Sequence, residues 1–439
     1  MNPGHRSAGI ETVTRTGVAT IGLIWVTSAV SQATFTGDVP FVGDNFGRSV
    51  AIEGNIAVVG APGDDENGAE AGAAYVYTRS GGNWSLLQKI AGTEVGAQFG
   101  FSVAVELDES GLNEGDFIAV GSLFGDGQVA NSGTVTMFRR QDPSPTFAFQ
   151  QTLSAGDGRS FDEFGYAIDL DLSIPSNSLG NDPVYTLVVG APDWNERGLD
   201  AGAIYICALS PDGTAWACYD KMVPDDIGGG DLLGRAVSIS GDDILAGATG
   251  WPSGNHPDGV VYIMRRFNDT GAGFFNWEVN NTLKPSDGVL GDRFGASVAI
   301  FGLSLAVGSE AAAATQFGAE GAVYLFENPI GPGTFNERGK ILPPDLANSL
   351  NFGSQVVIDR TLMAVTDRNG VGQVHFYSAR GVDWVPIEVL SVADPDAGQI
   401  GNAMAFSVPN ALTGDRIRTG GGAAYIVTNQ VIFDAGFEN

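Results

Sequence analysis

The sequence predicts an all-β protein, a seven-bladed β-propeller built from four-stranded antiparallel blades. Three observations support this fold class. The chain is rich in glycine, short runs of alternating apolar and polar residues recur along it, and one sequence motif, called here the Phe-Gly phrase, is repeated at intervals. Glycine accounts for 63 of the 439 residues, about twice its usual ~7% share. An interior glycine costs a helix roughly 1 kcal/mol relative to alanine, so this density disfavours long helices and favours turns.

The recurring phrase starts with Phe-Gly or a variant and continues into an alternating run such as SVAIEG. Its copies begin at Phe46, Phe99, Phe164, Leu233, Phe294 and Phe352, and a seventh copy that matches the motif less well begins at Ile400. Each copy then has a second run that ends in Gly-Ala or similar, a third run after a glycine-rich loop, and a fourth run after a turn. Four short strands per ~60 residues, repeated seven times, match a propeller. The alternative is a solenoid, but four meandering strands do not stack as single coils.

The repeat also predicts the domain boundaries. Residues 34–430 form the propeller, with blades starting near 46, 99, 164, 233, 294, 352 and 400. Residues 34–36 (TFT) stand where the fourth run stands before later copies. We therefore predict that they join the last blade and close the ring, which would protect its outer edge. The tail 431–439 is a competitor for the same edge, or a loose sorting signal.

The repeat resembles the FG-GAP repeat of integrin α-subunit propellers and of many secreted bacterial proteins. Both elements are clear in the first copy, FGRSVAIEGNIAVVGAP at 46–62, and in the third, which carries LVVGAP at 187–192. The resemblance implies an extracellular adhesion or ligand-binding propeller. It also implies that a calcium loop could lie between the first and second strands of a blade. It does not name a ligand, because many functions share this fold.

The first 33 residues have the pattern of a secretory signal peptide. Arg6 and Arg15 precede the apolar run at 17–30, and the small-residue stretch SQA ends at Ala33. We expect cleavage after Ala33. An uncleaved N-terminal anchor is the alternative, although the run is short for a membrane span. The protein is therefore expected to be secreted, at the cell surface or periplasmic, without membrane insertion after cleavage.

The two cysteines, Cys207 and Cys218, flank the turn signal Pro211-Asp212-Gly213. A regular hairpin around this turn sets the cysteines nearly opposite each other. In an exported protein this predicts a cross-strand disulfide. The alternative is a pair of buried free thiols.

The chain is strongly acidic, with 51 Asp and Glu against 22 Lys and Arg and a formal net charge of −29. Such a polyanion repels nucleic acid and anionic lipid surfaces, so neither is expected as a partner. In a four-stranded meander, the strand 2–3 loops and the blade-to-blade loops emerge on one face. Most acids map to these loops, where Arg159, Arg197, Arg293 and Arg368 are the opposing bases.

We predict that this acidic face binds an extracellular protein or glycan. The alternative is that the acids only maintain solubility. The candidate binding residues are Asp64, Asp65, Glu66, Trp194 and Trp251. We expect a monomeric propeller.

Two sets of residues are candidate calcium ligands. The first lies in an insert of the second copy and comprises Asp108, Ser110, Asn113 and Asp116. The second follows the pattern D-x4-D-x-[FL]-G before three copies, as the pairs Asp157/Asp162, Asp226/Asp231 and Asp287/Asp292. Ca²⁺ requires six to eight oxygen ligands. The alternatives are a solvated acidic hairpin for the first set and turn capping for the second.

No catalytic constellation emerges from the sequence. It contains no nucleophile elbow, zinc-binding helix motif or phosphate loop. We therefore expect a binding protein rather than an enzyme. A carbohydrate-active or other extracellular propeller enzyme and a structural component of an envelope or matrix are the alternatives.

Overall fold

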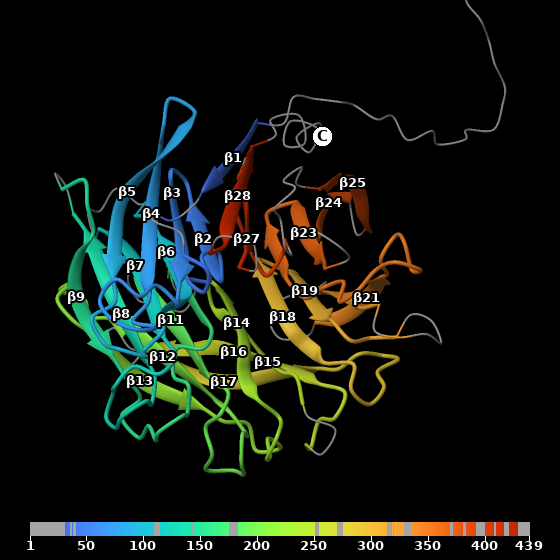
Figure 1. Ribbon diagram of the computed structural model, residues 1–439. Coiled ribbons are helices and arrows are strands. Elements are labelled where there is room, and N and C mark those ends of the chain that lie inside the picture. The colour runs from blue at the N-terminus through green and yellow to red at the C-terminus, as the bar shows by residue number, and fades with distance from the viewer. Residues whose placement is uncertain are drawn as a thin grey trace, which may run out of the picture.

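The computed structural model is a closed ring of seven β-sheets, each with four antiparallel strands (Figure 1). It describes residues 31–35, 37, 41–108, 115–141, 144–174, 183–250, 254–269, 275–313, 318, 320–328, 335–368, 372–380, 383–391, 400–407, 410–416 and 421–428. The described residues form strands, bridges and turns, and no helix among them is both long and apolar enough to cross a membrane. The predicted all-β, seven-bladed propeller is confirmed.

The strands of each blade follow the chain order from the centre of the ring outward. Blade one holds β2 (Ser49–Glu53), β3 (Ile56–Ala61), β4 (Ala73–Ser80) and β5 (Asn83–Ala91). Blade two holds β6 (Phe99–Glu106), β7 (Asp116–Ser122), β8 (Thr134–Arg140) and β9 (Ala148–Leu153). Blade three holds β10 (Ile168–Ser173), β11 (Val184–Ala191), β12 (Ala203–Leu209) and β13 (Trp216–Met222).

The same order continues around the ring. Blade four holds β14 (Leu233–Ser240), β15 (Asp243–Ala248), β16 (Val260–Asp269) and β17 (Phe275–Leu283). Blade five holds β18 (Phe294–Phe301), β19 (Ser304–Ser309), β20 (Ala322–Glu327) and β21 (Asn336–Ile341). Blade six holds β22 (Val356–Asp359), β23 (Leu362–Asp367), β24 (Gln373–Arg380) and β25 (Asp383–Leu390).

The last blade combines the two ends of the described chain. Its strands are β26 (Ala403–Ser407), β27 (Asn410–Asp415), β28 (Ala423–Thr428) and, as the outer strand, β1 (Ser31–Phe35). Figure 1 shows the blue β1 beside the red β28, and Thr34 pairs there with Tyr425. The strand begins at Ser31, so three of its residues precede the expected cleavage position after Ala33. Residue 36, the tail 431–439 and residues 1–30 of the expected signal peptide lie outside the described residues.

The phenylalanine that starts each copy fills the space between two blades. Phe46 is 1% exposed and packs with Tyr75 of its own blade and with Leu412 and Ala424 of the last blade. Its ring meets that of Tyr75 edge to face, with centroids 5.1 Å apart. Aromatic rings bury much apolar area and add specific geometry to it. The aromatic position that recurs at the start of most copies is therefore a packing element of the ring.

Glycine is required where neighbouring blades converge. A Cβ atom at Gly60 of β3 would collide with the carbonyl oxygen of Gly100 in the next blade, and one at Gly414 would collide with that of Gly47 across the ring closure. Close backbone approach of this kind is what glycine permits. A serine also links the two blades at this place, because the Ser49 hydroxyl donates a hydrogen bond to the Gly100 carbonyl at 2.8 Å.

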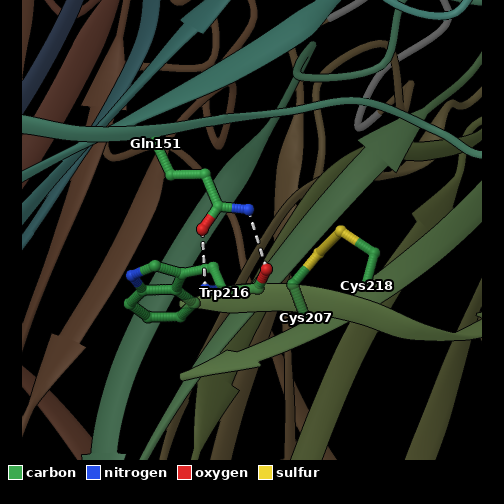
Figure 2. The surroundings of a disulfide bond; sticks show 4 residues. All are labelled: Gln151, Cys207, Trp216 and Cys218. Atoms are coloured by element: carbon green, nitrogen blue, oxygen red, sulfur yellow. Dashed lines mark hydrogen bonds between the residues drawn. A yellow bond between two sulfur atoms is a disulfide. The ribbon is translucent and has the colours of Figure 1, made fainter. Parts of the chain in front are cut away.

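A pair of hydrogen bonds also joins the outer strands of blades two and three, and Figure 2 shows it beside the disulfide. The Gln151 amide of β9 donates to the Trp216 carbonyl at 2.9 Å and accepts from the Trp216 N–H at 2.8 Å. Blade three also contains the predicted cross-strand disulfide, in which Cys207 of β12 is the register partner of Cys218 of β13. The disulfide prediction is confirmed.

Candidate functional site

The second aspartate of each predicted pair caps its own turn. Asp162, Asp231 and Asp292 are buried. Each accepts a backbone N–H from the third residue before it, at 2.7, 2.8 and 2.9 Å respectively. Asp44 does the same with the N–H of Phe41. Each carboxylate thus closes the turn that precedes it by a local side-chain-to-backbone hydrogen bond, so the turn interpretation accounts for these carboxylates.

The first aspartate of each pair holds a tyrosine of the third strand. The hydroxyls of Tyr205, Tyr262 and Tyr324 donate to Asp157, Asp226 and Asp287 at 2.8, 2.8 and 2.6 Å. Lysine from the outer strand completes two of these sites, because Lys221 pairs with Asp157 and Lys340 pairs with Asp287 at 3.0 Å.

These partners change the electrostatics of the aspartates. The hydrogen bond from Tyr324 is the largest influence on Asp287, and it lowers the pKa of that carboxyl. Burial opposes this effect, and Lys340 adds to it. All six paired aspartates therefore have protein donors. Among the residues that the structure describes, no group of three or more His, Cys, Asp or Glu side chains is placed to hold a metal ion.

The insert in the second copy is described only at its ends. Asp116 forms an ion pair with Arg140 at 2.6 Å and accepts the backbone N–H of Asp108 at 3.0 Å. Ser110 and Asn113 lie outside the described residues. A cation at this insert would have to compete with Arg140 for the Asp116 carboxylate.

The predicted binding-face residues divide into exposed and buried ones. Asp65 and Glu66 are exposed at the tip of the loop after β3. Asp64 is only 5% exposed, because it binds the Tyr75 hydroxyl at 2.8 Å and Lys89 at 3.0 Å. Trp194 is 2% exposed and packs in the core, so its expected role as a surface aromatic is wrong. Trp251 lies outside the described residues.

The meander places the loops between second and third strands and the loops between blades on one end of the ring, called here the loop face. Most of the exposed large apolar side chains lie on this face. They are Phe41, Val42, Val95, Val129, Phe161, Leu199, Val289, Leu290, Leu342, Leu346 and Leu350. Phe161 is 57% exposed and has a φ of 68°, which is a strained conformation for a bulky residue. The loop face thus presents apolar tips among its acids.

A central channel runs along the axis of the ring. Two cavities, of about 410 and 590 Å³, follow each other along it. They share a lining from the middle of the inner strands, including Val50, Val103, Ile168 and Val298. One cavity opens where the inner strands begin, at the loop face, and the other opens where these strands end.

The channel end at the loop face is lined by arginines. Arg48, Arg235, Arg368 and Arg416 surround the cavity of about 410 Å³, and we call this end the arginine mouth. Burial lowers the pKa of Arg48 to about 10, and repulsion from the other three arginines acts in the same direction. The other three guanidinium groups are thus close enough to Arg48 to repel it.

Aromatic rings support two of these arginines. The guanidinium carbon of Arg48 lies 4.0 Å from the ring centroid of Phe101. Phe101 in turn lies 5.3 Å from Tyr166, and Arg235 lies 5.7 Å from the Tyr166 ring. Four consecutive blades therefore contribute a row of side chains, in the order arginine, two aromatics and arginine. Cation–π contacts of this kind stabilise a guanidinium group without neutralising its charge.

The opposite channel end is acidic. Glu53, Glu106, Asp169, Asp171 and Asp359 line it, together with Arg360, and we call it the acidic mouth. Burial raises the pKa of Glu106 to about 9, and repulsion from Asp171, Glu53 and Asp169 adds to this shift. Burial likewise raises the pKa of Asp169 to about 7.

A comparison with known protein families agrees with this architecture. A family model described as "FG-GAP repeat" matches residues 30–77, 216–264 and 277–326. The chain carries FG-GAP repeats at these positions in a seven-bladed β-propeller. The segments 216–264 and 277–326 each begin in the outer strand of one blade and end in the third strand of the next blade. The segment 30–77 begins next to β1, the outer strand of the last blade, and ends in β4, the third strand of blade one. The offset explains why β1 is needed to complete the last blade.

Among solved structures, the chain matches the crystal structure of the Saccharomyces cerevisiae Sqt1. The similarity spans 90% of this chain and 97% of that chain, with a TM-score of 0.46 and 12% sequence identity.

The arginine mouth of this propeller was not identified from the sequence. Its inner-strand residues occupy the position directly after Phe-Gly or its variant. Around the ring this position holds Arg48, Phe101, Tyr166, Arg235, Ala296, Ser354 and Asn402. Comparing that single position between copies would have revealed two arginines flanking two aromatics. The expected list of bases on the loop face included Arg368 but omitted Arg48, Arg235 and Arg416, and is corrected here.

Proposed function

We propose that this FG-GAP propeller is an exported binding module that engages a protein partner with a basic surface. The observation that carries the proposal is the clustering of exposed apolar side chains at the tips of an acidic loop face. Interfaces commonly combine a few apolar anchors with charged groups that speed encounter. Apolar tips such as Phe161 and Leu199, 57% and 75% exposed, would supply the anchors.

A protein partner is favoured over a glycan. Trp194, the tryptophan expected to stack on a sugar, is buried in the core. Exposed aliphatic tips such as Leu199, Val289 and Leu290 suit a protein surface better, because they offer apolar area without hydrogen-bonding groups.

Export and calcium are parts of the same proposal. The basic, apolar and small-residue pattern at 1–33 and the Cys207–Cys218 disulfide both favour an oxidising compartment. Calcium would act at the insert between Asp108 and Asp116. A melting temperature that is the same with Ca²⁺ and with EDTA would contradict the calcium part and leave the rest of the proposal standing.

The test compares two exposed phenylalanines. Phe161 lies on the loop face and Phe149 lies on the outer strand β9, and they are 57% and 65% exposed. Cross-linking and pull-down from envelope and extracellular extracts would use the wild type, Phe161→Asn combined with Asp65→Lys and Glu66→Lys, and the control Phe149→Asn. We expect the loop-face variant to lose its captured partner by at least about tenfold while the control retains it. Equal capture by all three proteins would contradict the proposal.

A further inference from the structure

We propose that the arginine mouth binds a small oxyanion with two or more negative charges, carried by phosphate or carboxylate groups. Four guanidinium groups, from blades one, four, six and seven, line one cavity of about 410 Å³. This size falls in the usual range of small-molecule pockets, about 300–1,000 Å³. The inference goes beyond the proposed protein-binding function, because it concerns the channel and not the loop tips.

The positive charge of the mouth is largely uncompensated. Glu310 is the single acid among the residues that line this cavity. It lies 3.1 Å from Arg293, outside the cavity lining, and 4.0 Å from Arg368. In the part of the chain that the structure describes, no carboxylate lies within ion-pair distance of Arg48, Arg235 or Arg416.

Two acids on the same face act on Arg235 from farther away. The charge of Arg235 lowers the pKa of the Glu163 and Asp193 carboxyls. Burial is the larger influence and raises these pKa values to about 7 and about 6. Neither carboxylate lies within ion-pair distance of Arg235, so the two acids offset the charge of the arginine cluster only in part. A multiply charged oxyanion would relieve the repulsion among the four guanidinium groups, which a neutral ligand cannot do.

Two of the four arginines are positioned by aromatic rings before any ligand arrives. Phe101 and Tyr166 hold Arg48 and Arg235 by their ring faces. The N–H groups at the edge of a guanidinium plane match the oxygens of a carboxylate or phosphate in paired hydrogen bonds. The buried Nε of Arg368 has no hydrogen-bond partner among the described residues. Such a group is costly to leave unpaired, and a bound oxyanion would supply an acceptor.

The surroundings select a small anion over a polymeric one. The mouth lies at the centre of the loop face, whose tips carry exposed acids such as Asp65, Glu66 and Asp225. A long polyanion would meet these acids along its length and be repelled. A compact ion can pass between the loops and reach the arginines.

Binding is measured by titration calorimetry and thermal shift on the purified protein in a phosphate-free buffer. The probes are pyrophosphate, citrate, acetate and heparin oligosaccharide. We expect saturable binding of pyrophosphate or citrate with a rise in melting temperature, and at least tenfold weaker binding of acetate and heparin. The tighter of the first two ligands identifies phosphate or carboxylate as the preferred group. No saturable binding of either would overturn the proposal.

Two variants locate the site. Arg48→Gln combined with Arg235→Gln should weaken binding by at least tenfold. Arg416→Gln, at an exposed position where folding should be unaffected, should weaken it about threefold. Arg360→Gln, at the opposite channel end, is the control and should bind like the wild type. Equal binding by the wild type and both mouth variants would overturn the assignment. Because these probes involve no protein partner, the result is independent of the proposed loop-face interaction.

Discussion

The two ends of the central channel are lined by opposite ends of the same inner strands. The arginine mouth is positively charged, and the acidic mouth is lined mainly by carboxyl groups. At the arginine mouth, Arg48 and Arg235 follow the Phe-Gly phrase or its variant, and at the acidic mouth Glu106 and Asp171 stand at or near the strand ends. The blades are held together elsewhere, by interblade glycines and phenylalanines. Residues at the two ends of the inner strands can therefore differ in charge without altering the ring.

The two mouths relieve their charge by different means. Glu106, with its pKa raised to about 9, stays protonated at neutral pH and so avoids repulsion from its neighbours. Arg48, even with its pKa lowered to about 10, remains charged there. A carboxyl group can take up a proton, but an arginine near neutral pH can be neutralised only by an anion. The difference explains why the arginine mouth, and not the acidic mouth, is the better candidate for a ligand site.

The largest expected effect comes from breaking the ring that supports both mouths. Gly414→Ala would place a Cβ against the Gly47 carbonyl at the closure between the last blade and blade one. We expect a loss of about 3 kcal/mol in the free energy of unfolding, measured by urea denaturation. Gly339→Ala on the outer strand β21, where no atom lies within 4 Å of the new Cβ, is the control and should be neutral. Similar losses in both variants would show that the closure is not the sensitive point.

An intermediate effect is expected at the acidic mouth. The ordinary pKa of Glu106 is 4.5 and the folded value is about 9, so the folded state binds a proton that the unfolded state has released. Its contribution to stability is complete below pH 4.5 and falls as the pH rises towards 9. Glu106→Gln should remove this dependence and stabilise the protein by about 1–2 kcal/mol at pH 8, with little effect at pH 4.

Urea denaturation across this pH range measures the effect. Glu278→Gln, at an exposed position on the outer strand β17, is the control. A pH profile unchanged by Glu106→Gln would contradict the raised pKa and weaken the contrast between the two mouths.

The smallest effect is expected at the arginine mouth without ligand. Arg416 is exposed and adds to the repulsion acting on Arg48 and Arg368. Arg416→Gln should therefore raise the free energy of unfolding by about 0.5 kcal/mol in low-salt, phosphate-free buffer. The gain should shrink at high salt because ions screen exposed charges. Thermal melting at two salt concentrations gives the measurement, and a destabilised variant would mean that Arg416 has a structural partner.

Much of the fold followed from repetition in the sequence. The spacing from Phe46 to Ile400 predicted seven blades, and the turn at Asp212 predicted the Cys207–Cys218 bond. These features depend on contacts that recur locally, within a blade or between adjacent blades. The paired aspartates were also identified as turn-capping candidates, but their bonds to Tyr205, Tyr262 and Tyr324 were not.

The sequence by itself determined the net acidic charge and the number of blades, because strand alternation and repeat spacing are local properties of the chain. Only the tertiary structure decided which groups meet. It buried Trp194 and Asp64, and it brought Arg48, Arg235, Arg368 and Arg416 to one cavity. The first and last of these arginines are hundreds of residues apart, and closing the ring is what makes them neighbours.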